Sequence, residues 1–173
     1  ISALMPVHNG GAWLQPAVFS LLDNEVPLEL IVVDDGSDDG AVLGLAAACD
    51  DPRVQILRLG KVGLAGALNA GLEVASGPWL ARMDADDISA PRRLDVTFAA
   101  LQECPDPAST VMSCAVTPIG PEGPAGPGIT RFCRWINTIL TPAQHWQSRL
   151  IEQPLANPST LVATDAVRNI GGF

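Results

Sequence analysis

The chain has 173 residues, of which 47% are hydrophobic and 17% charged, and its formal net charge is −9. This length and apolar content suffice for a buried core, which excludes a disordered acidic tail and favours a single domain over residues 1–173. Nucleic-acid polymers are excluded as main partners, because their phosphates need clustered Lys and Arg, and only ten bases stand against 19 acidic residues here.

The first half of the chain alternates strand and helix signals. Apolar runs bounded by Gly, Pro or Asp predict strands at Ile1–Val7, Leu28–Val33, Val54–Leu59 and Trp79–Met83. Helical spacing or Ala- and Leu-rich composition predicts helices at Leu14–Leu22, Ala41–Cys49, Ala65–Ala75 and Leu94–Leu101. Because this alternation is typical of βαβ crossovers, we expect an α/β fold with a mostly parallel sheet flanked by helices.

The pattern changes after residue 116. Thr117–Gly128 is dominated by Pro and Gly and predicts an exposed loop. A helix is predicted over Trp135–Ile151, a strand over Ser159–Ala163 and a helical turn over Asp165–Asn169. We find no internal repeat and no second core.

Two acidic clusters follow predicted strands. Asp34, Asp35, Asp38 and Asp39 come directly after Leu28–Val33, and Asp84, Asp86 and Asp87 come directly after Trp79–Met83. In open α/β sheets, ligands bind beyond the carboxyl ends of the strands. We therefore expect both clusters at one edge of the sheet.

The cluster at 84–87 has the chemistry of a cation site. In an extended segment Asp84 and Asp86 would project to one side, with Asp87 on the other. Oxygen ligands suit Mg²⁺ or Mn²⁺, which complete their shell with substrate phosphates. A solvated acidic loop preceding a helix near Pro91 is the alternative, and the cluster by itself does not decide between them.

The cluster at 34–39 is more ambiguous. Asp, Gly and Ser are ordinary turn residues, and Asp38 or Asp39 could cap the helix Ala41–Cys49. A functional alternative is that one carboxylate binds a base or a ribose. The segment Gly63–Gly71 has neither the GxGxxG spacing nor a P-loop, and Asn69 within it needs a partner if it is buried.

The two ends of the sequence and its four cysteines lead to further expectations. The chain begins at Ile1, shows no signal peptide, and ends at Gly171–Phe173 as if within a motif, so we expect a fragment of a longer protein. Its longest apolar run, near Ala41–Cys49, is too short to span a membrane. The four cysteines form no CxxC pair, which favours free thiols in a reducing compartment.

Taken together, these motifs resemble the family 2 nucleotide-sugar glycosyltransferases, which have the GT-A fold. The matching segments, in the order of the family, are MPVHN (Met5–Asn9), VVDDGSDD (Val32–Asp39), GLAGALNAG (Gly63–Gly71), SGPWLARMDADD (Ser76–Asp87) with Pro91 and Arg93–Leu94 after it, NPSTLV (Asn157–Val162) and GGF (Gly171–Phe173). The resemblance covers nearly the whole chain and implies a single Rossmann-like GT-A domain.

The resemblance also implies roles for the matching positions. Asp35 would face the base of the nucleotide, and Asp86 would be the better metal ligand, with Asp84 near the ribose or a metal-bound water. The implied donor-binding positions are Pro6, His8, Asn9, Asp34, Asp35, Ser37, Gly63, Asn69 and Asp84. The implied ligands of a divalent cation, Mn²⁺ or Mg²⁺, are Asp84 and Asp86.

The chain departs from the family pattern in two places. Lys61 stands where the family usually has Asn, which would alter a contact on the pyrophosphate side of the donor. The general base of the family is an acidic residue that follows the GG-aromatic segment, and this chain ends at Phe173. The catalytic base is therefore unknown, and the fragment is expected to bind a donor but to transfer sugar poorly.

The leading hypothesis is an inverting, metal-dependent glycosyltransferase that uses a nucleoside diphosphate sugar, with UDP favoured. The expected acceptor is a saccharide or a lipid-linked saccharide, and the expected location is the cytoplasm, or the cytoplasmic face of a membrane reached through parts outside this sequence. Three alternatives stay open: an inactive donor-binding domain, a sugar-1-phosphate nucleotidyltransferase, and a phospho-acceptor signalling domain. The last two lack expected features, namely a basic Gly-rich loop after the first strand and an aligned acceptor Asp with a later Lys.

Overall fold

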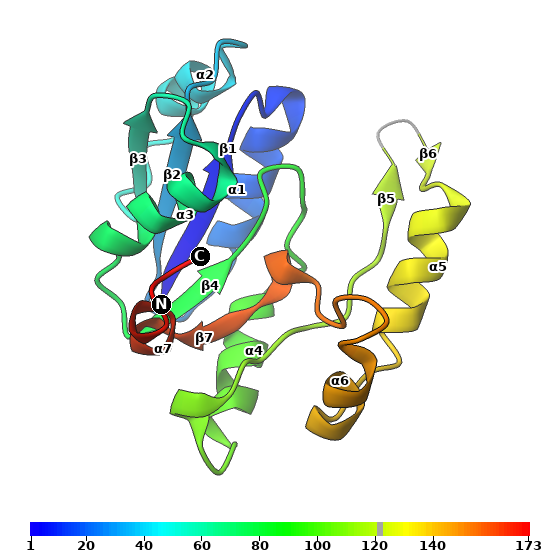
Figure 1. Cartoon of the computed structure of the whole chain (residues 1–173). Helices are drawn as coiled ribbons and strands as arrows, with labels where there is room; N and C mark the ends of the chain where they lie inside the picture. The colour runs from blue at the N-terminus through cyan, green and yellow to red at the C-terminus, as the bar shows by residue number, and fades with distance from the viewer. Residues whose placement is uncertain (121–122) are drawn as a thin grey trace.

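A five-stranded sheet forms the centre of the computed structural model, which describes residues 1–120 and 123–173 (Figure 1). Its strands, in spatial order, are β3 (Val54–Leu59), β2 (Glu29–Asp35), β1 (Ser2–Val7), β4 (Trp79–Arg82) and β7 (Leu161–Ala163). The first four are parallel and β7 runs antiparallel to β4. The expectation of a mostly parallel sheet is confirmed.

Helices cover both faces of this sheet. One face carries α1 (Leu14–Leu22), α2 (Ala41–Ala48) and α4 (Arg93–Gln102), and the other carries α3 (Gly63–Val74) and α7 (Thr164–Asn169). Successive residues of β1 face opposite helix layers. Met5 packs in the core on the side of α1, α2 and α4, and Leu4 packs in the core on the side of α3 and α7. Such two-sided burial explains the nearly continuous apolar strands.

Close packing positions α3 on the sheet. Gly71 lies so near Leu4 and Val33 that a Cβ atom there would stand 3.0 and 3.1 Å from their side chains. A larger residue would push the helix outward, and the N-terminus of α3 would then move away from the ends of the strands. The Ala- and Gly-rich segment is therefore a packing surface as well as a sequence motif.

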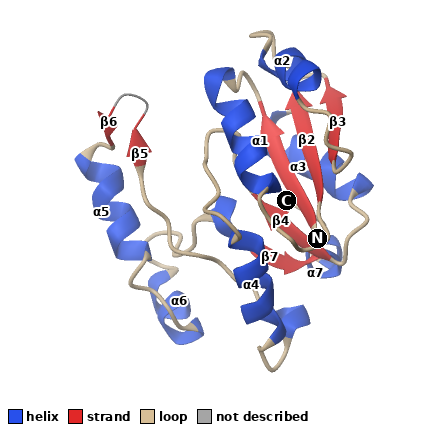
Figure 2. Ribbon diagram, turned by 180° about the vertical axis from the view of Figure 1, so that it is seen from behind, coloured by secondary structure: helices blue, strands red, loops and turns tan. Residues whose placement is uncertain are grey.

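A peripheral lobe, residues 119–120 and 123–148, lies beside the sheet (Figures 1 and 2). It contains the strand pair β5 (Ile119–Gly120) and β6 (Gly123–Pro124), followed by α5 (Pro127–Ile136) and α6 (Pro142–Ser148). The segment Thr117–Gly128, which was predicted as an exposed loop, contains the strand pair β5–β6 and the first two residues of α5. Its residues 121 and 122 lie outside the described residues.

The prediction of one helix over Trp135–Ile151 is wrong. α5 ends at Ile136, and the side chain of Asn137 pairs with the main chain of Val116 at 2.9 and 2.8 Å. A new helix begins at Pro142, where Thr141 and Gln144 form a capping box. Apolar spacing alone did not reveal this start signal inside the segment.

The remaining elements agree with the predicted bounds within two residues at each end. Short 3-10 turns complete the described chain at Gly11–Trp13, Pro107–Ser109 and Asn157–Ser159. Among the described residues, none of the helices has the length and apolar character needed to cross a membrane.

Candidate functional site

The loops that follow β1 and β2 are tied together at the carboxyl edge of the sheet. The main-chain N–H of Asn9 donates to Ser37 Oγ at 3.0 Å, and Asn9 Oδ1 accepts from the main-chain N–H of Asp38 at 2.9 Å. Asn9 has a φ of 57°, a backbone conformation that Asn tolerates better than most residues. These reciprocal bonds hold His8, Asn9 and Ser37 in one place.

Asp34 and Asp35 are the last two residues of β2. Both are buried, at 4% and 7% exposure. Asp34 Oδ1 accepts from the main-chain N–H of Ser37 at 2.8 Å, and its Oδ2 lies 3.5 Å from Arg58 Nε. These two contacts replace part of the hydration that the buried carboxylate has lost, and they fix Asp34 against the loop after β2.

The Asp35 carboxylate binds the N-terminus of α3. It accepts from the main-chain N–H of Val62 at 2.5 Å and from that of Gly63 at 3.0 Å. Negative charge is favourable there because these amides lack partners within the helix and lie at the positive end of its dipole. Asp35 thus joins the end of β2 to the start of α3.

Asp39 joins the loops in a similar way from the solvent side. Its carboxylate accepts from the main-chain N–H of Gly11 at 2.8 Å and of Ala41, the first residue of α2, at 3.0 Å. The hydrogen bonds from Ala41 and Gly11 hold the pKa of Asp39 below its usual value. Asp38 and Asp39 were both suggested as caps for this helix, and it is Asp39 that accepts the hydrogen bond from its first residue, Ala41.

His8 and Lys61 place two basic side chains at this edge. His8 Nδ1 lies 3.0 Å from the main-chain oxygen of Asp35, so this nitrogen carries the proton. The other ring nitrogen, Nε2, lies 3.2 Å from Lys61 Nζ and accepts a hydrogen bond from it. The pair brings the only Lys of the sequence into the candidate site, because the β3–α3 loop passes beside the end of β2.

The acidic segment after β4 forms a turn instead of the extended segment assumed from the sequence. The main-chain N–H of Asp87 donates to the oxygen of Asp84 at 3.2 Å, and Asp86 is exposed at the corner. Asp84 Oδ1 accepts from Arg82 at 2.8 Å. The prediction that Asp84 and Asp86 project to one side of an extended segment and Asp87 to the other is therefore wrong, because side chains in a turn do not alternate as they do in a strand.

The three carboxylates of this turn repel one another. Burial raises the pKa of Asp84, helped by Asp86 and opposed by Arg82. Burial raises the pKa of Asp87 to about 6, with further contributions from Asp84 and Asp86. A cation placed among them would relieve this repulsion.

A cavity of about 380 Å³ adjoins the turn, and both Asp87 and Arg93 line it. Arg93 donates to the main-chain oxygen of Pro158 at 3.0 Å, which ties the start of α4 to the turn before β7. Arg93 belongs to the segment that resembles the family, but no role for it was predicted from the sequence. The available signal was its position as a base in the first turn of the helix that follows three carboxylates.

Asn69 has a partner away from these loops. Its side-chain amide pairs with the main chain of Phe173 in both directions, at 2.9 and 3.2 Å. Gly172 has a φ of 94°, and a Cβ there would clash with Asn69 Oδ1, which favours Gly at this position. Asn69, which lies on α3, is thus hydrogen-bonded to the segment Gly171–Phe173.

The structure brings most predicted positions to one edge. The loops after β1 and β2 and the start of α3 meet there and carry His8, Asn9, Asp34, Asp35, Ser37 and Gly63. β4 is the neighbour of β1 on its other side, so Asp84 and Asp86 follow a strand that ends at the same edge. Pro6 lies inside β1 and is buried.

Comparison with known protein families identifies this arrangement. A model described as "Glycosyl transferase family 2" matches residues 2–139. The succinoglycan biosynthesis protein ExoO of Rhizobium meliloti (strain 1021) is 40% identical over 96 residues, which are 54% of this chain and 27% of that protein. Glycosyltransferase GlyG of Streptococcus pneumoniae serotype 4 (strain ATCC BAA-334 / TIGR4) is 34% identical over 110 residues, 60% of this chain and 35% of that protein.

Solved structures share the fold over nearly the whole chain. The mannosyltransferase PcManGT from Pyrobaculum calidifontis, solved with GDP-Man and Mn²⁺, superposes with a TM-score of 0.70 at 22% identity, covering 99% of this chain and 46% of that one. S. aureus TarS 1-349 in complex with UDP gives 0.73 at 19% identity, covering 98% and 48%. The chain therefore has the Rossmann-like GT-A fold and spans less than half the length of these proteins.

Proposed function

The chain belongs to glycosyl transferase family 2, and we propose that it binds a nucleoside diphosphate sugar, with UDP as the nucleotide, for transfer of the sugar with inversion to a saccharide or lipid-linked acceptor. One observation carries the proposal: the two carboxylate-bearing loops after β2 and β4 flank β1 at one edge of the sheet. Ligands of open α/β sheets bind at such an edge. The likeness to proteins solved with UDP and GDP-Man supports it.

We propose that the nucleoside lies over the loops after β1 and β2. His8, Asn9 and Ser37 are exposed or half-buried there and are already fixed by main-chain hydrogen bonds. A preorganised site loses less conformational entropy when a ligand binds. Asp34 and Asp35 support this surface from within, since their oxygens hold Ser37 and the start of α3.

The turn at 84–87 has the chemistry for a divalent cation. Asp86 is exposed and Asp84 lies beside it. The pKa values of Asp84 and Asp87 are raised, first by burial and further by the negative charges of their neighbours in the turn. Among the described residues, no group of three or more His, Cys, Asp or Glu is placed to hold a metal ion. We therefore propose two protein ligands, Asp84 and Asp86, for Mn²⁺ or Mg²⁺, whose remaining ligands would be donor phosphates and water.

When bound, the cation would neutralise the charge that develops on the departing diphosphate. Asp86 would bind it directly, and Arg82 would keep Asp84 ionised and oriented through the 2.8 Å pair. Lys61, near the start of α3, would offer the phosphates a positive charge on the opposite side. The general base for inverting transfer would follow Phe173, where the family resemblance places it.

The four cysteines are free, and this supports a location in a reducing compartment such as the cytoplasm.

Calorimetric titration with UDP tests the proposal. We expect binding that depends on Mn²⁺, weaker binding of UMP because it lacks one phosphate, and a loss of about tenfold or more for Asp86→Asn, which keeps the shape but removes the charge. Asp165→Asn is the matched control, since Asp165 is 86% exposed on α7. Binding of UDP that is independent of Mn²⁺, or equal in wild type and Asp86→Asn, would disprove the proposed site.

A further inference from the structure

The surface around α6 carries several large apolar side chains that are exposed to solvent. Leu140 precedes the helix, Trp146 lies within it, and Leu150 and Ile151 follow it. These four side chains, which we call the α6 patch, are between 67% and 83% exposed. Apolar side chains that gather at one exposed place mark an interaction surface, whereas single exposed ones are ordinary.

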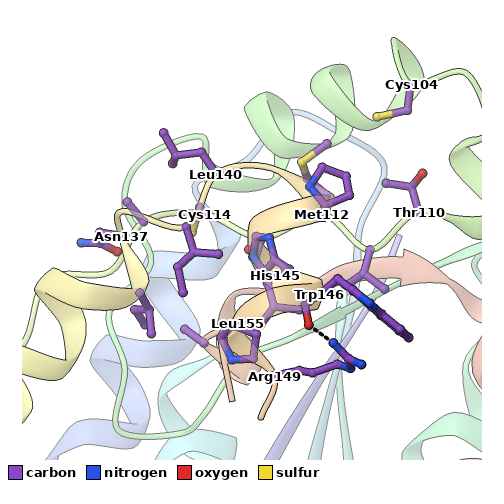
Figure 3. A pocket seen from close by; sticks show the side chains of 18 of the residues that line it. Cys104, Thr110, Met112, Cys114, Asn137, Leu140, His145, Trp146, Arg149 and Leu155 are labelled. Carbon is purple, nitrogen blue, oxygen red and sulfur yellow. Dashed lines mark hydrogen bonds between the residues drawn. The ribbon is translucent and has the colours of Figure 1, made fainter. Parts of the chain in front are cut away.

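The members of the α6 patch lie around one short helix. Leu140 and Trp146 line the same cavity of about 680 Å³ (Figure 3). After α6 the chain turns, and the main-chain N–H of Ile151 donates to the oxygen of Ser148 at 2.9 Å. This turn keeps Leu150 and Ile151 beside the end of the helix. The exposure is therefore concentrated in one part of the molecule.

This part of the molecule is also basic, in contrast to the rest of the chain. Residues 107–151 contain three of the ten basic residues but one of the 19 acidic residues, within a chain of net charge −9. Arg131 and Arg134 are exposed on α5, and Arg149 directly follows α6. Within the described part of the chain, none of these three arginines forms an ion pair with a carboxylate. Their positive charge is thus available to an anionic partner.

Arg149 and Trp146 form a stacked pair within the patch. The Arg149 guanidinium lies 3.4 Å from the centre of the Trp146 ring and donates to the Trp146 main-chain oxygen (Figure 3). Both side chains have an apolar body and a polar end, and such side chains favour the boundary between hydrocarbon and water. Exposed apolar groups beside unpaired arginines are the combination that an anionic lipid surface attracts.

We propose that the α6 patch binds the surface of an anionic lipid bilayer. Leu140, Trp146 and Leu150 would enter the outer hydrocarbon region, and the arginines would lie among the headgroups. α6 has seven residues, about 10 Å of helix, whereas the hydrocarbon core is roughly 30 Å thick, so the patch would lie on the bilayer. The residues of this chain would make the contact themselves, and the contact is separate from the binding of a donor or an acceptor.

Sedimentation with lipid vesicles tests the proposal. We expect the chain to pellet with vesicles of phosphatidylcholine and phosphatidylglycerol, and to bind vesicles of phosphatidylcholine alone severalfold more weakly, because these have no net charge. Leu150→Asp should weaken binding about tenfold or more, because it places a charge where hydrocarbon is expected. Leu43→Asp is the matched control and should bind as wild type does, since it adds the same charge at a Leu that is 61% exposed on α2.

A second pair of variants tests the contribution of charge. Arg134→Gln should weaken binding to the anionic vesicles about fivefold and leave binding to phosphatidylcholine unchanged. Arg53→Gln, in the loop before β3, changes the net charge by the same unit outside the peripheral lobe and should have little effect. The difference between these two variants should shrink in about 0.5 M NaCl, because salt screens the attraction.

Fluorescence quenching shows which side chains enter the bilayer. Brominated phosphatidylcholine in the anionic vesicles quenches Trp side chains that reach the acyl region. We expect quenching in wild type and its loss in Trp146→Phe, which keeps an aromatic ring at the patch. The other three Trp side chains, at positions 13, 79 and 135, then report on the rest of the molecule.

Circular dichroism of all variants checks that they fold. The proposal is wrong if the chain does not pellet with anionic vesicles, if Leu150→Asp and Leu43→Asp bind alike, or if quenching persists in Trp146→Phe. It is also wrong if wild type sediments as a dimer in analytical ultracentrifugation and Leu150→Asp as a monomer, since a second copy of the chain then covers the patch. These measurements contain no nucleotide, so their outcome is independent of the proposed function.

Discussion

Single residues at the carboxyl edge differ in function because their environments differ. Asp86 is exposed, whereas Asp87, its neighbour in sequence, is half-buried in the wall of a cavity. Burial and the charges of Asp84 and Asp86 raise the pKa of Asp87 to about 6. Its burial in the turn thus makes Asp87 a carboxylate that takes up a proton at about pH 6.

This pKa predicts how cation binding depends on pH. Protons and a divalent cation compete for the same negative charge, so Mn²⁺-dependent binding of UDP should weaken as pH falls through about 6 and strengthen as pH rises above it. Calorimetry between about pH 5 and pH 8 measures the change. In Asp87→Asn the affinity should be lower at pH 8 and nearly flat around pH 6. A profile of Asp87→Asn identical to that of wild type would contradict the prediction.

At the scale of elements, α3 connects the site to the rest of the fold. Its N-terminus is held by Asp35, its middle packs on the sheet through Gly71, and Asn69 binds the main chain of Phe173. Asn69 is six residues after Gly63, about 9 Å along the helix. The segment Gly171–Phe173 is therefore attached to the same rigid element that carries part of the candidate donor site.

The contact between Asp35 and α3 should be measurable as stability. Asp35→Ala removes the acceptor for Val62 and Gly63 and should lower the free energy of unfolding by about 1–2 kcal/mol, the usual cost of losing a helix cap. Urea unfolding followed by circular dichroism gives the value.

Asp35→Asn should lose less stability than Asp35→Ala, because the amide retains one oxygen that accepts a hydrogen bond. Asp38→Ala is the control at an exposed neighbour, where we expect a change within about 0.5 kcal/mol. Equal losses at Asp35 and Asp38 would show that the contact with α3 contributes nothing.

At the scale of the whole molecule, charge is concentrated where the site is. Seven of the acidic residues lie at the end of β2 or in the loops after β2 and β4, within a chain of net charge −9. The field at this edge opposes a bare diphosphate and attracts a cation. The acidic composition is thus compatible with a nucleotide ligand, provided that a cation binds with it.

Ionic strength tests this electrostatic account. Mn²⁺ binding without nucleotide, followed by electron paramagnetic resonance, should weaken severalfold between about 0.05 M and about 0.5 M NaCl, because the Debye length falls from roughly 14 Å to roughly 4 Å. Asp165→Asn changes the net charge by one unit far from the edge and should alter the affinity little. An affinity independent of salt would disprove the contribution of the long-range field.

Much of the candidate site could be predicted from the sequence because its cues are local. Apolar runs, helical spacing and strand-end carboxylates lie within a few residues of one another, and the motifs His8–Asn9, Asp34–Asp35 and Asp84–Asp86 follow directly from them. The resemblance to glycosyltransferases rested on the order of these motifs, and the family match confirms it.

Other features depend on contacts between distant segments, and only the tertiary structure decided them. Phe173 binds Asn69, 104 residues away, and Arg93 binds Pro158, 65 residues away. Residues 84–87 form a turn where the sequence predicted an extended segment. A cavity of about 680 Å³, lined by Met112, Ile136 and Trp146 among others, lies where the peripheral lobe meets the end of α4. The sequence by itself determined the fold class and the two acidic loops, because periodicity and motif order are properties of neighbouring residues. The pairing of side chains and the shape of the cavities required the packed chain, because they arise between segments that meet only when it folds.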